Sequence, residues 1–334
     1  MYTHLRRLVI ATMMLAAVLV LAACGGDDDE SAGNGSDDDA SAETQKVDVL
    51  MNWFAQAEQG GYWQADAAGL GKDQGVDLNV RQGGPQIQTI PQVASGESMF
   101  GIGQADELLL ARSEGVPVVE VFGGMDKYLQ CMMFHADQDI NDWPDLEGHQ
   151  VAVAPSGGFW PFIKGKYDLD DVQEVNFTGD MATFARNKEL VQQCFITSEP
   201  YVADQEGIDI EAKLIADAGY NPYGQGLFTT ERVIQEDPEL VRAVVAAVQQ
   251  GWKDYLKDPT KGNELILETN KDMEQAKLDF AHKEIKTGDY FADPIGSMEA
   301  ERWETIADQL RDAGVLTKDV DPSEVWTDEF MPQG

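Results

Sequence analysis

Apolar and polar positions follow two different periods along residues 46–124. Short runs rich in β-branched residues alternate with polar positions and predict strands, as in KVDVLMNW, VDLNVRQ, SMFGIGQ and VPVVEVFGG. Between these runs, apolar residues recur at helical spacing, as at Trp63, Ala67 and Leu70, and a further helix is expected to open near Ala105. Strands separated by helices of this length predict a parallel, doubly wound α/β sheet with ligands at the carboxyl ends of its strands.

The pattern restarts after Gly123-Gly124 and predicts a second α/β unit. Strands are expected in YLQCMMFHAD, HQVAVAPSGG, VQEVNFTG and AKLIADAG, and a helix followed by a strand in ATFARNKELVQQCFITSEPY. The run GLFTTERVI predicts one more strand, and the rest of the chain is mainly helical. The longest predicted helix, within residues 237–259, has one apolar stripe that is expected to be core: Leu240, Val244, Val248, Trp252 and Tyr255.

A folded body of nearly 290 residues is too long for one hydrophobic core. We expect residues 46–124 and 220–334 to form one lobe, and residues 125–219 to be inserted as a second lobe. Two connections, near 123–127 and 218–222, would then act as a hinge, with the ligand cleft between the lobes.

The first 45 residues are expected to direct and tether the protein rather than to fold. Residues 1–23 have a short basic start and an apolar run, which is typical of a secretory signal peptide. The small residues before Cys24 resemble a bacterial lipobox, in which this cysteine receives lipid; a plain signal peptide and twin-arginine export are the alternatives. Residues 24–45 are acidic and rich in Gly and Ser, so they predict a disordered tether.

The chain carries a formal net charge of −36. Loss of Arg6 and Arg7 with the signal peptide changes it to −38, and subtraction of the eight tether acids leaves −30 on residues 46–334. Nucleic acid and anionic lipid are therefore excluded as partners of the folded body, because both are repelled. The excess of Asp and Glu residues is interpreted as a solvated surface, as in a salt-adapted protein, rather than as a cation-binding site.

Cysteines and histidines are too few and too scattered for metal or nucleophile chemistry. The four histidines show no metal-ligand spacing, and no cofactor or metal is expected. Apart from Cys24, only Cys131 and Cys194 remain. In an oxidising exterior these two either form a disulfide or stay as buried thiols.

The segment MNWFAQAEQGGYW, residues 51–63, concentrates aromatic residues around a Gly-Gly pair. Trp53 and Phe54 follow a strand directly and are expected to form pocket walls, whereas Trp63 begins a helical stripe and is expected to be core. Tyr62 fits either position. The glycine pair is interpreted as a turn that lets a ligand approach the backbone.

Several segments together resemble one known family across residues 47–332. They include NWFAQAEQGGYW, GGPQ, ASGESMFGIGQADELLLARSEG, DLEGHQVAVAPSG, TSEPYVADQEG and VWTDEFMP. The chain is similar to solute-binding lipoproteins of ABC importers, in the nitrate, sulfonate and thiamine-pyrimidine group called thiamine-pyrimidine synthase-like. The resemblance implies a type II periplasmic-binding-protein fold, in which each of two lobes is a doubly wound sheet with flanking helices. It also implies a monomer, lipid-anchored at Cys24 on the outer side of the cell membrane, that delivers its ligand to an ABC permease.

The resemblance and the strand-end positions together predict the ligand-binding residues. Gln59 lies where relatives often carry a histidine, and Glu199 is expected to accept from an amino or imino group. The alternatives are a helix cap for Asp106, a local ion pair or backbone bond for Glu199, and a simple turn for the loop around Gly84. The full predicted set is Asn52, Trp53, Phe54, Gln59, Tyr62, Gly84, Gln104, Asp106, Ser156, Gly157, Phe159, Trp160, Glu199, Tyr201 and Tyr223.

Many aromatic residues and little positive charge favour a small aromatic or heterocyclic nutrient, either a thiamine-pyrimidine precursor or a riboflavin-like ring. The alternative ligand is an anion such as a sulfonate or nitrate, for which Arg81, Arg112 and Arg186 are the candidates. Fungal relatives form the thiamine pyrimidine enzymatically, but they carry a cysteine-rich motif that this chain lacks, so no enzymatic activity is expected. A surface receptor without transport is the remaining alternative.

Overall fold

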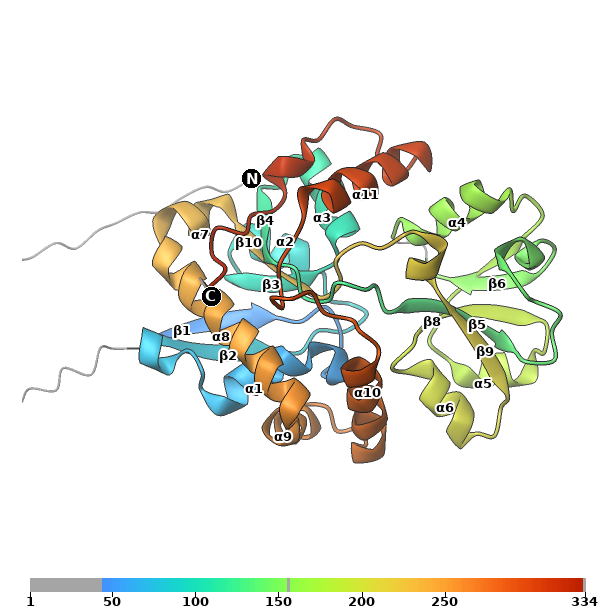
Figure 1. Ribbon diagram of the computed structural model, residues 1–334, viewed down its shortest axis with the longest axis horizontal. Helices are drawn as coiled ribbons and strands as arrows, with labels where there is room; N and C mark the ends of the chain where they lie inside the picture. The colour runs from blue at the N-terminus through green and yellow to red at the C-terminus, as the bar shows by residue number, and fades with distance from the viewer. Residues whose placement is uncertain (1–43, 155–156, 333–334) are drawn as a thin grey trace, which may run out of the picture. The chain divides into compact units, whose positions relative to one another are not determined.

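The computed structural model describes residues 44–154 and 157–332 as two five-stranded sheets with surrounding helices (Figure 1). The predicted signal peptide, residues 24–43 of the predicted tether with Cys24, and Ser156 lie outside the described residues. The predicted end of the tether at residue 45 is wrong by one residue, because Gln45 already pairs in strand β1. No helix in the two described ranges is long and apolar enough to cross a membrane.

The first sheet has the strand order β2-β1-β3-β10-β4. Its strands are β1 (Gln45–Leu50), β2 (Val76–Arg81), β3 (Phe100–Gly103), β4 (Val118–Phe122) and β10 (Gly226–Thr230). Strands β1, β2 and β3 run parallel, but β10 runs antiparallel to both β3 and β4. The expectation of a purely parallel sheet is therefore wrong, because the chain re-enters this sheet from the second one and inserts β10 in the opposite direction.

The second sheet has the order β7-β6-β8-β5-β9. Its strands are β5 (Gln130–His135), β6 (Gln150–Val153), β7 (Gln173–Asn176), β8 (Leu190–Phe195) and β9 (Ile210–Leu214). Here β6 is parallel to β7 and β8, whereas β5 is antiparallel to β8 and β9. This sheet is also mixed, because β5 arrives directly from the first sheet.

Eleven α-helices and five 3-10 turns connect the strands within the described ranges. The helices are α1 (Gly60–Ala68), α2 (Thr89–Ser95), α3 (Ala105–Ser113), α4 (Phe159–Tyr167), α5 (Met181–Arg186), α6 (Glu199–Gln205), α7 (Glu231–Glu236), α8 (Pro238–Lys257), α9 (Thr260–Thr269), α10 (Gln275–Thr287) and α11 (Ala300–Asp312). The 3-10 turns are η1 (Ala57–Gln59), η2 (Lys72–Gln74), η3 (Trp143–Leu146), η4 (Ile215–Ala218) and η5 (Pro322–Glu324).

The chain crosses between the sheets twice, in residues 123–129 and 215–225. We call residues 130–214 the sheet-2 half, and residues 44–122 with 226–332 the sheet-1 half. The predicted lobe boundaries after residues 124 and 219 fall within the crossing segments, and they stay predictions.

The longest helix, α8, shows how sequence determines local structure. The Asp237 side chain accepts a hydrogen bond from the Leu240 amide, and Pro238 occupies the first turn, where its missing N–H costs nothing. All five residues of the predicted apolar stripe are buried, which confirms the stripe as core. The stripe lies against α1, where Gly60 and Gly61 leave room for the rings of Tyr255 and Trp252.

Two interpretations of local sequence were wrong. A Cβ atom at Gly61 would lie 2.2 Å from the Trp252 ring, so the glycine pair serves helix packing at the start of α1 rather than a ligand turn. The strand predicted for GLFTTERVI ends at Thr230, whose hydroxyl accepts from the Val233 amide and begins helix α7. Helix α3 does begin at Ala105, as predicted.

Candidate functional site

Two large aromatic rings are exposed where the chain leaves β1. The side chains of Trp53 and Phe54 are 42% and 43% exposed, and their ring centroids lie 5.6 Å apart at an interplanar angle of 70°. Contiguous exposed apolar surface marks binding sites, whereas apolar side chains that are exposed singly are ordinary. We call Trp53 and Phe54 the aromatic ledge.

The loop after β2 holds the aromatic ledge in place. The Gly83 amide donates to the Trp53 carbonyl at 2.8 Å, and a Cβ atom on Gly83 would lie 2.1 Å from the Met51 carbonyl oxygen. Gly84 lies beside the Phe54 ring. Only glycine at position 83 allows the two loops to approach so closely.

A buried amide supports the residue that precedes the ledge. Gln59 is fully buried; its Nε2 donates to Asn52 Oδ1 at 3.3 Å, and its Oε1 accepts from Trp63 Nε1 at 3.3 Å. Gln59 therefore orients Asn52, which is partly exposed. Tyr62 is also fully buried, and its hydroxyl donates to the Gln225 carbonyl at 2.6 Å.

Asp106 joins three parts of the chain. It is the second residue of α3, and the helix cap position belongs to Gln104. One carboxylate oxygen of Asp106 accepts from the Gly158 amide at 3.1 Å and from the Tyr220 hydroxyl at 2.7 Å; the other accepts from the Glu107 amide at 3.0 Å. The Asp106 carboxylate thus connects the sheet-1 half, the second crossing segment and the start of α4. Burial, and then the charge of Asp106, raise the pKa of Tyr220 well above its ordinary value.

The aromatic residues predicted from the PSGGFW segment lie inside the protein. Phe159 and Trp160 begin α4 and are 3% and 4% exposed, and both pack in a core that also contains Tyr220. Gly157 precedes them with a φ of +104°, a backbone conformation that favours glycine.

Glu199 begins α6, and one of its oxygens accepts from the Phe195 amide at 2.8 Å. Burial raises the pKa of Glu199; the Phe195 amide lowers it, and the nearby charge of Glu58 raises it further. Tyr201 is half-buried, and its ring centroid lies 5.5 Å from that of Phe280 in α10. Contacts from α10 and Glu58 bring this segment of the sheet-2 half against the sheet-1 half.

Tyr223 lies in the second crossing segment and is buried. Its hydroxyl accepts from the Glu299 amide at 2.8 Å, and the Arg302 guanidinium lies 4.5 Å from the ring centroid. Burial raises the pKa of Tyr223 to about 12. These contacts brace the crossing segment against the start of α11.

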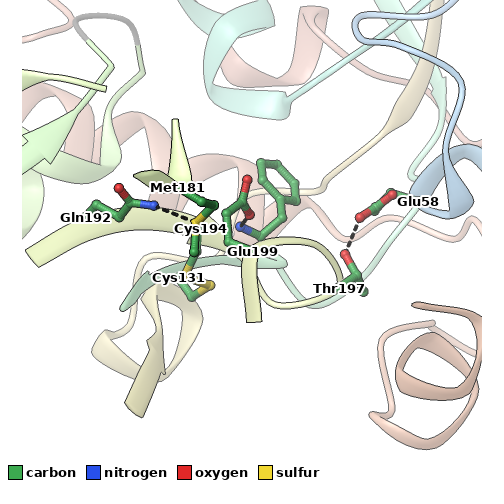
Figure 2. Close-up of a disulfide and its surroundings, with 8 residues drawn as sticks. Glu58, Cys131, Met181, Gln192, Cys194, Thr197 and Glu199 are labelled. Atoms are coloured by element: carbon green, nitrogen blue, oxygen red, sulfur yellow. Dashed lines mark hydrogen bonds between the residues drawn. A yellow bond between two sulfur atoms is a disulfide. The ribbon is translucent and has the colours of Figure 1, made fainter. Parts of the chain in front are cut away.

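A disulfide lies next to the Glu199 segment (Figure 2). Cys131 and Cys194 are directly opposite each other in the antiparallel pair β5 and β8, and the structure joins their sulfurs. Cys194 precedes Thr197, whose hydroxyl donates to the Glu58 carboxylate. Glu58 was not among the predicted residues; the only signal was one charge within an otherwise apolar and amide-rich segment.

Neither a candidate metal cluster nor either of two surface cavities involves the predicted residues that the structure describes. Among the residues with described positions, no cluster of three or more His, Cys, Asp or Glu side chains could hold a metal ion. Cavities of about 620 Å³, beside the start of β1, and about 250 Å³, beside Arg302, are lined by none of the predicted residues.

Two mixed five-stranded sheets with surrounding helices, connected by two crossing segments, define the fold of periplasmic binding proteins. The periplasmic aliphatic sulphonate binding protein SsuA from Escherichia coli has the same fold, with a TM-score of 0.65 at 12% identity over 84% of this chain and 91% of that one.

The chain belongs to the family described as NMT1/THI5 like, whose model matches residues 56–262. It is 24% identical over 316 residues to the riboflavin-binding protein RibY of Chloroflexus aurantiacus, which covers 88% of each chain. It is also 25% identical over 283 residues to the formylaminopyrimidine-binding protein of Halalkalibacterium halodurans, covering 80% of this chain and 84% of that relative.

Proposed function

We propose that the chain is the extracytoplasmic solute-binding component of an ABC importer, and that it captures a small flat heterocyclic molecule. The observation that carries this proposal is the exposed aromatic ledge, Trp53 and Phe54, at the carboxyl end of β1. A flat ring stacked on an aromatic side chain gains about 0.5–1.5 kcal/mol beyond its buried area. The names of the two binding-protein relatives support the same class, a flavin or an aminopyrimidine.

Two polar groups, one in each half of the protein, would give the ligand its orientation. Asn52 is held by Gln59 and can both donate and accept, whereas the Glu199 carboxylate accepts from a ring amine. A micromolar ligand needs about −8 kcal/mol of binding free energy. One stacked ring with two or three hydrogen bonds in a closed site supplies that amount after the ordering costs.

An anionic ligand is less well supported, because two of the candidate arginines already have carboxylate partners. Arg81 lies 3.4 Å from Asp48, and Arg112 contacts both Glu231 at 2.5 Å and Glu324 at 3.2 Å. A sulfonate or nitrate would have to displace these carboxylates within a body of strong negative charge.

The proposed role includes the predicted location and partners. Lipid attachment at Cys24 would keep a monomeric protein on the outer face of the membrane, beside the permease that receives the ligand. The ligand would be released chemically unchanged, since binding and transfer need no catalytic group.

The first test is to purify the full chain in detergent, unfold it, and identify any released small molecule by mass spectrometry. Refolded protein is then melted with riboflavin, formylaminopyrimidine, an alkanesulfonate or nitrate. A ligand at 100 times its dissociation constant should stabilise the protein by about 2.7 kcal/mol, a rise in Tm of several degrees. If only the alkanesulfonate or nitrate raises Tm, the proposed ligand class is wrong.

The second test replaces the ring that we expect to stack. W53A should weaken binding of the heterocycle by about 1–3 kcal/mol, which raises the dissociation constant measured by calorimetry roughly 5- to 150-fold. W53F keeps a ring and should retain most of the affinity. V175A changes another exposed apolar side chain, in β7 of the sheet-2 half, and controls for a general surface effect. Equal affinities for W53A and V175A would remove Trp53 from the site.

A further inference from the structure

One buried hydrogen bond joins the two halves beside the candidate site. Glu58 lies in η1, at the entry to α1, and Thr197 lies just after β8. The Thr197 hydroxyl donates to Glu58 Oε1, across 139 positions of sequence (Figure 2). Glu58 is 2% exposed and Thr197 is fully buried, so the contact is closed to solvent.

A carboxylate in this position depends strongly on its hydrogen-bond donor. Burial of an ionised carboxylate is costly unless donors replace the water that it loses. Of the residues that the structure describes, Thr197 alone donates to the Glu58 side chain. Separation of the two halves would take the Thr197 hydroxyl away from Glu58, and loss of that hydroxyl would leave a buried carboxylate without a donor among the described residues.

Neighbouring contacts belong to the same junction. Phe195 and Ile196 pack against the core of the sheet-1 half, and the Tyr201 ring meets Phe280 of α10. The charge of Glu58 also reaches Glu199, two residues after Thr197. The segment 195–201, which carries two predicted ligand residues, therefore meets the sheet-1 half through one small polar contact surrounded by apolar ones.

We propose that the Glu58–Thr197 hydrogen bond is a latch between the two halves, and that it sets how often the candidate site opens before a ligand arrives. This proposal rests on the proposed function, because closure of the two halves over a ligand is what gives the latch a role. Glu58 and Thr197 are positioning residues in this scheme, since they hold the walls of the site without having to touch the ligand.

The test is backbone hydrogen exchange of the full chain, measured by mass spectrometry with no ligand added. T197V removes the hydroxyl at nearly constant volume, and T197S keeps it. Because a hydrogen bond to a charged group is lost, T197V should speed exchange by about 10- to 100-fold in peptides covering residues 54–60 and 195–201 together. T197S should exchange like the parent, and strand β10 should be unchanged in both variants.

Two results would overturn the proposal. Unchanged exchange in T197V shows that the bond does not control opening, and faster exchange confined to residues 195–201 shows only local loosening. If T197V does not fold, E58L decides in the same assay, because it removes the carboxylate that accepts from the Thr197 hydroxyl. An unchanged exchange rate in both peptides of E58L then overturns the latch. Since no ligand is added, failure of the ligand panel would overturn the proposed ligand class and leave this result standing.

Discussion

Replacing Glu120 with glutamine should stabilise the protein progressively, relative to the parent, as the pH rises. Glu120 lies in β4 and is fully buried, and its two carboxylate oxygens have no hydrogen-bond partner among the residues that the structure describes. The Oε1 atom lies against the backbone of Gly226. Burial, and then the negative charge of Asp106, raise the pKa of Glu120 well above its ordinary value of 4.5.

The sign of the effect follows from where the proton is held. The folded protein keeps a proton on Glu120 that the unfolded chain releases near pH 4.5. The contribution of Glu120 to stability is therefore fully present below that pH, and it is lost as the pH rises toward the pKa of the folded state. Across that window the loss is about 1.4 kcal/mol per pH unit.

The assay is guanidinium unfolding of the parent and E120Q between pH 4 and pH 8. A buried glutamine amide adds a cost of about 1–3 kcal/mol that does not vary with pH, so the informative quantity is the slope. The difference in unfolding free energy should shift in favour of E120Q by about 1.4 kcal/mol per pH unit. E268Q, at an exposed helix position, controls for the loss of one negative charge. Parallel pH profiles for E120Q and the parent would refute the reasoning.

Two further stability predictions come from close contacts. G158A should lower the unfolding free energy by about 1–3 kcal/mol, because its Cβ atom would lie 2.2 Å from the Tyr220 hydroxyl. G165A, inside the helix α4 that Gly158 precedes, has open space and should be neutral or slightly stabilising; equal melting temperatures for the two variants would contradict this account. The double variant C131S/C194S should lose about 4 kcal/mol in guanidinium unfolding, since the disulfide closes a loop of 63 residues, and added reductant should then affect only the parent.

Features that depend on local sequence could be predicted from the amino-acid sequence alone. The apolar stripe of α8, the start of α3 at Ala105 and the burial of Trp63 all follow from periodicity and from residue type at a strand end. The two-sheet α/β fold followed from the alternation of strands and helices together with the family resemblance. These features are set by neighbours a few positions away.

Features that depend on residues distant in the sequence could not be predicted from the amino-acid sequence. The direction of β10 depends on the path by which the chain returns from the second sheet, which no local pattern records. The sequence around Gly60 and Gly61 predicts a turn, and only the packing of the Tyr255 and Trp252 rings of α8 shows why both positions are glycine. Likewise, the partners of Asp106 lie 52 and 114 positions away, so its place at a junction of three segments could not be read from its neighbours.

Some polar residues of the candidate site already use their hydrogen-bonding groups on other parts of the protein. Asp106 accepts three protein donors, and Gln59 uses its amide nitrogen on Asn52 and its amide oxygen on Trp63. Such groups hold the residues that can meet a ligand, in the way that outer-shell groups orient the ligands of a metal. At position 59 a neutral amide supplies one donor and one acceptor at every pH, whereas a histidine, often found there in the resembled family, would lose its acceptor on protonation. The glutamine therefore keeps the orientation of Asn52 beside the aromatic ledge independent of pH.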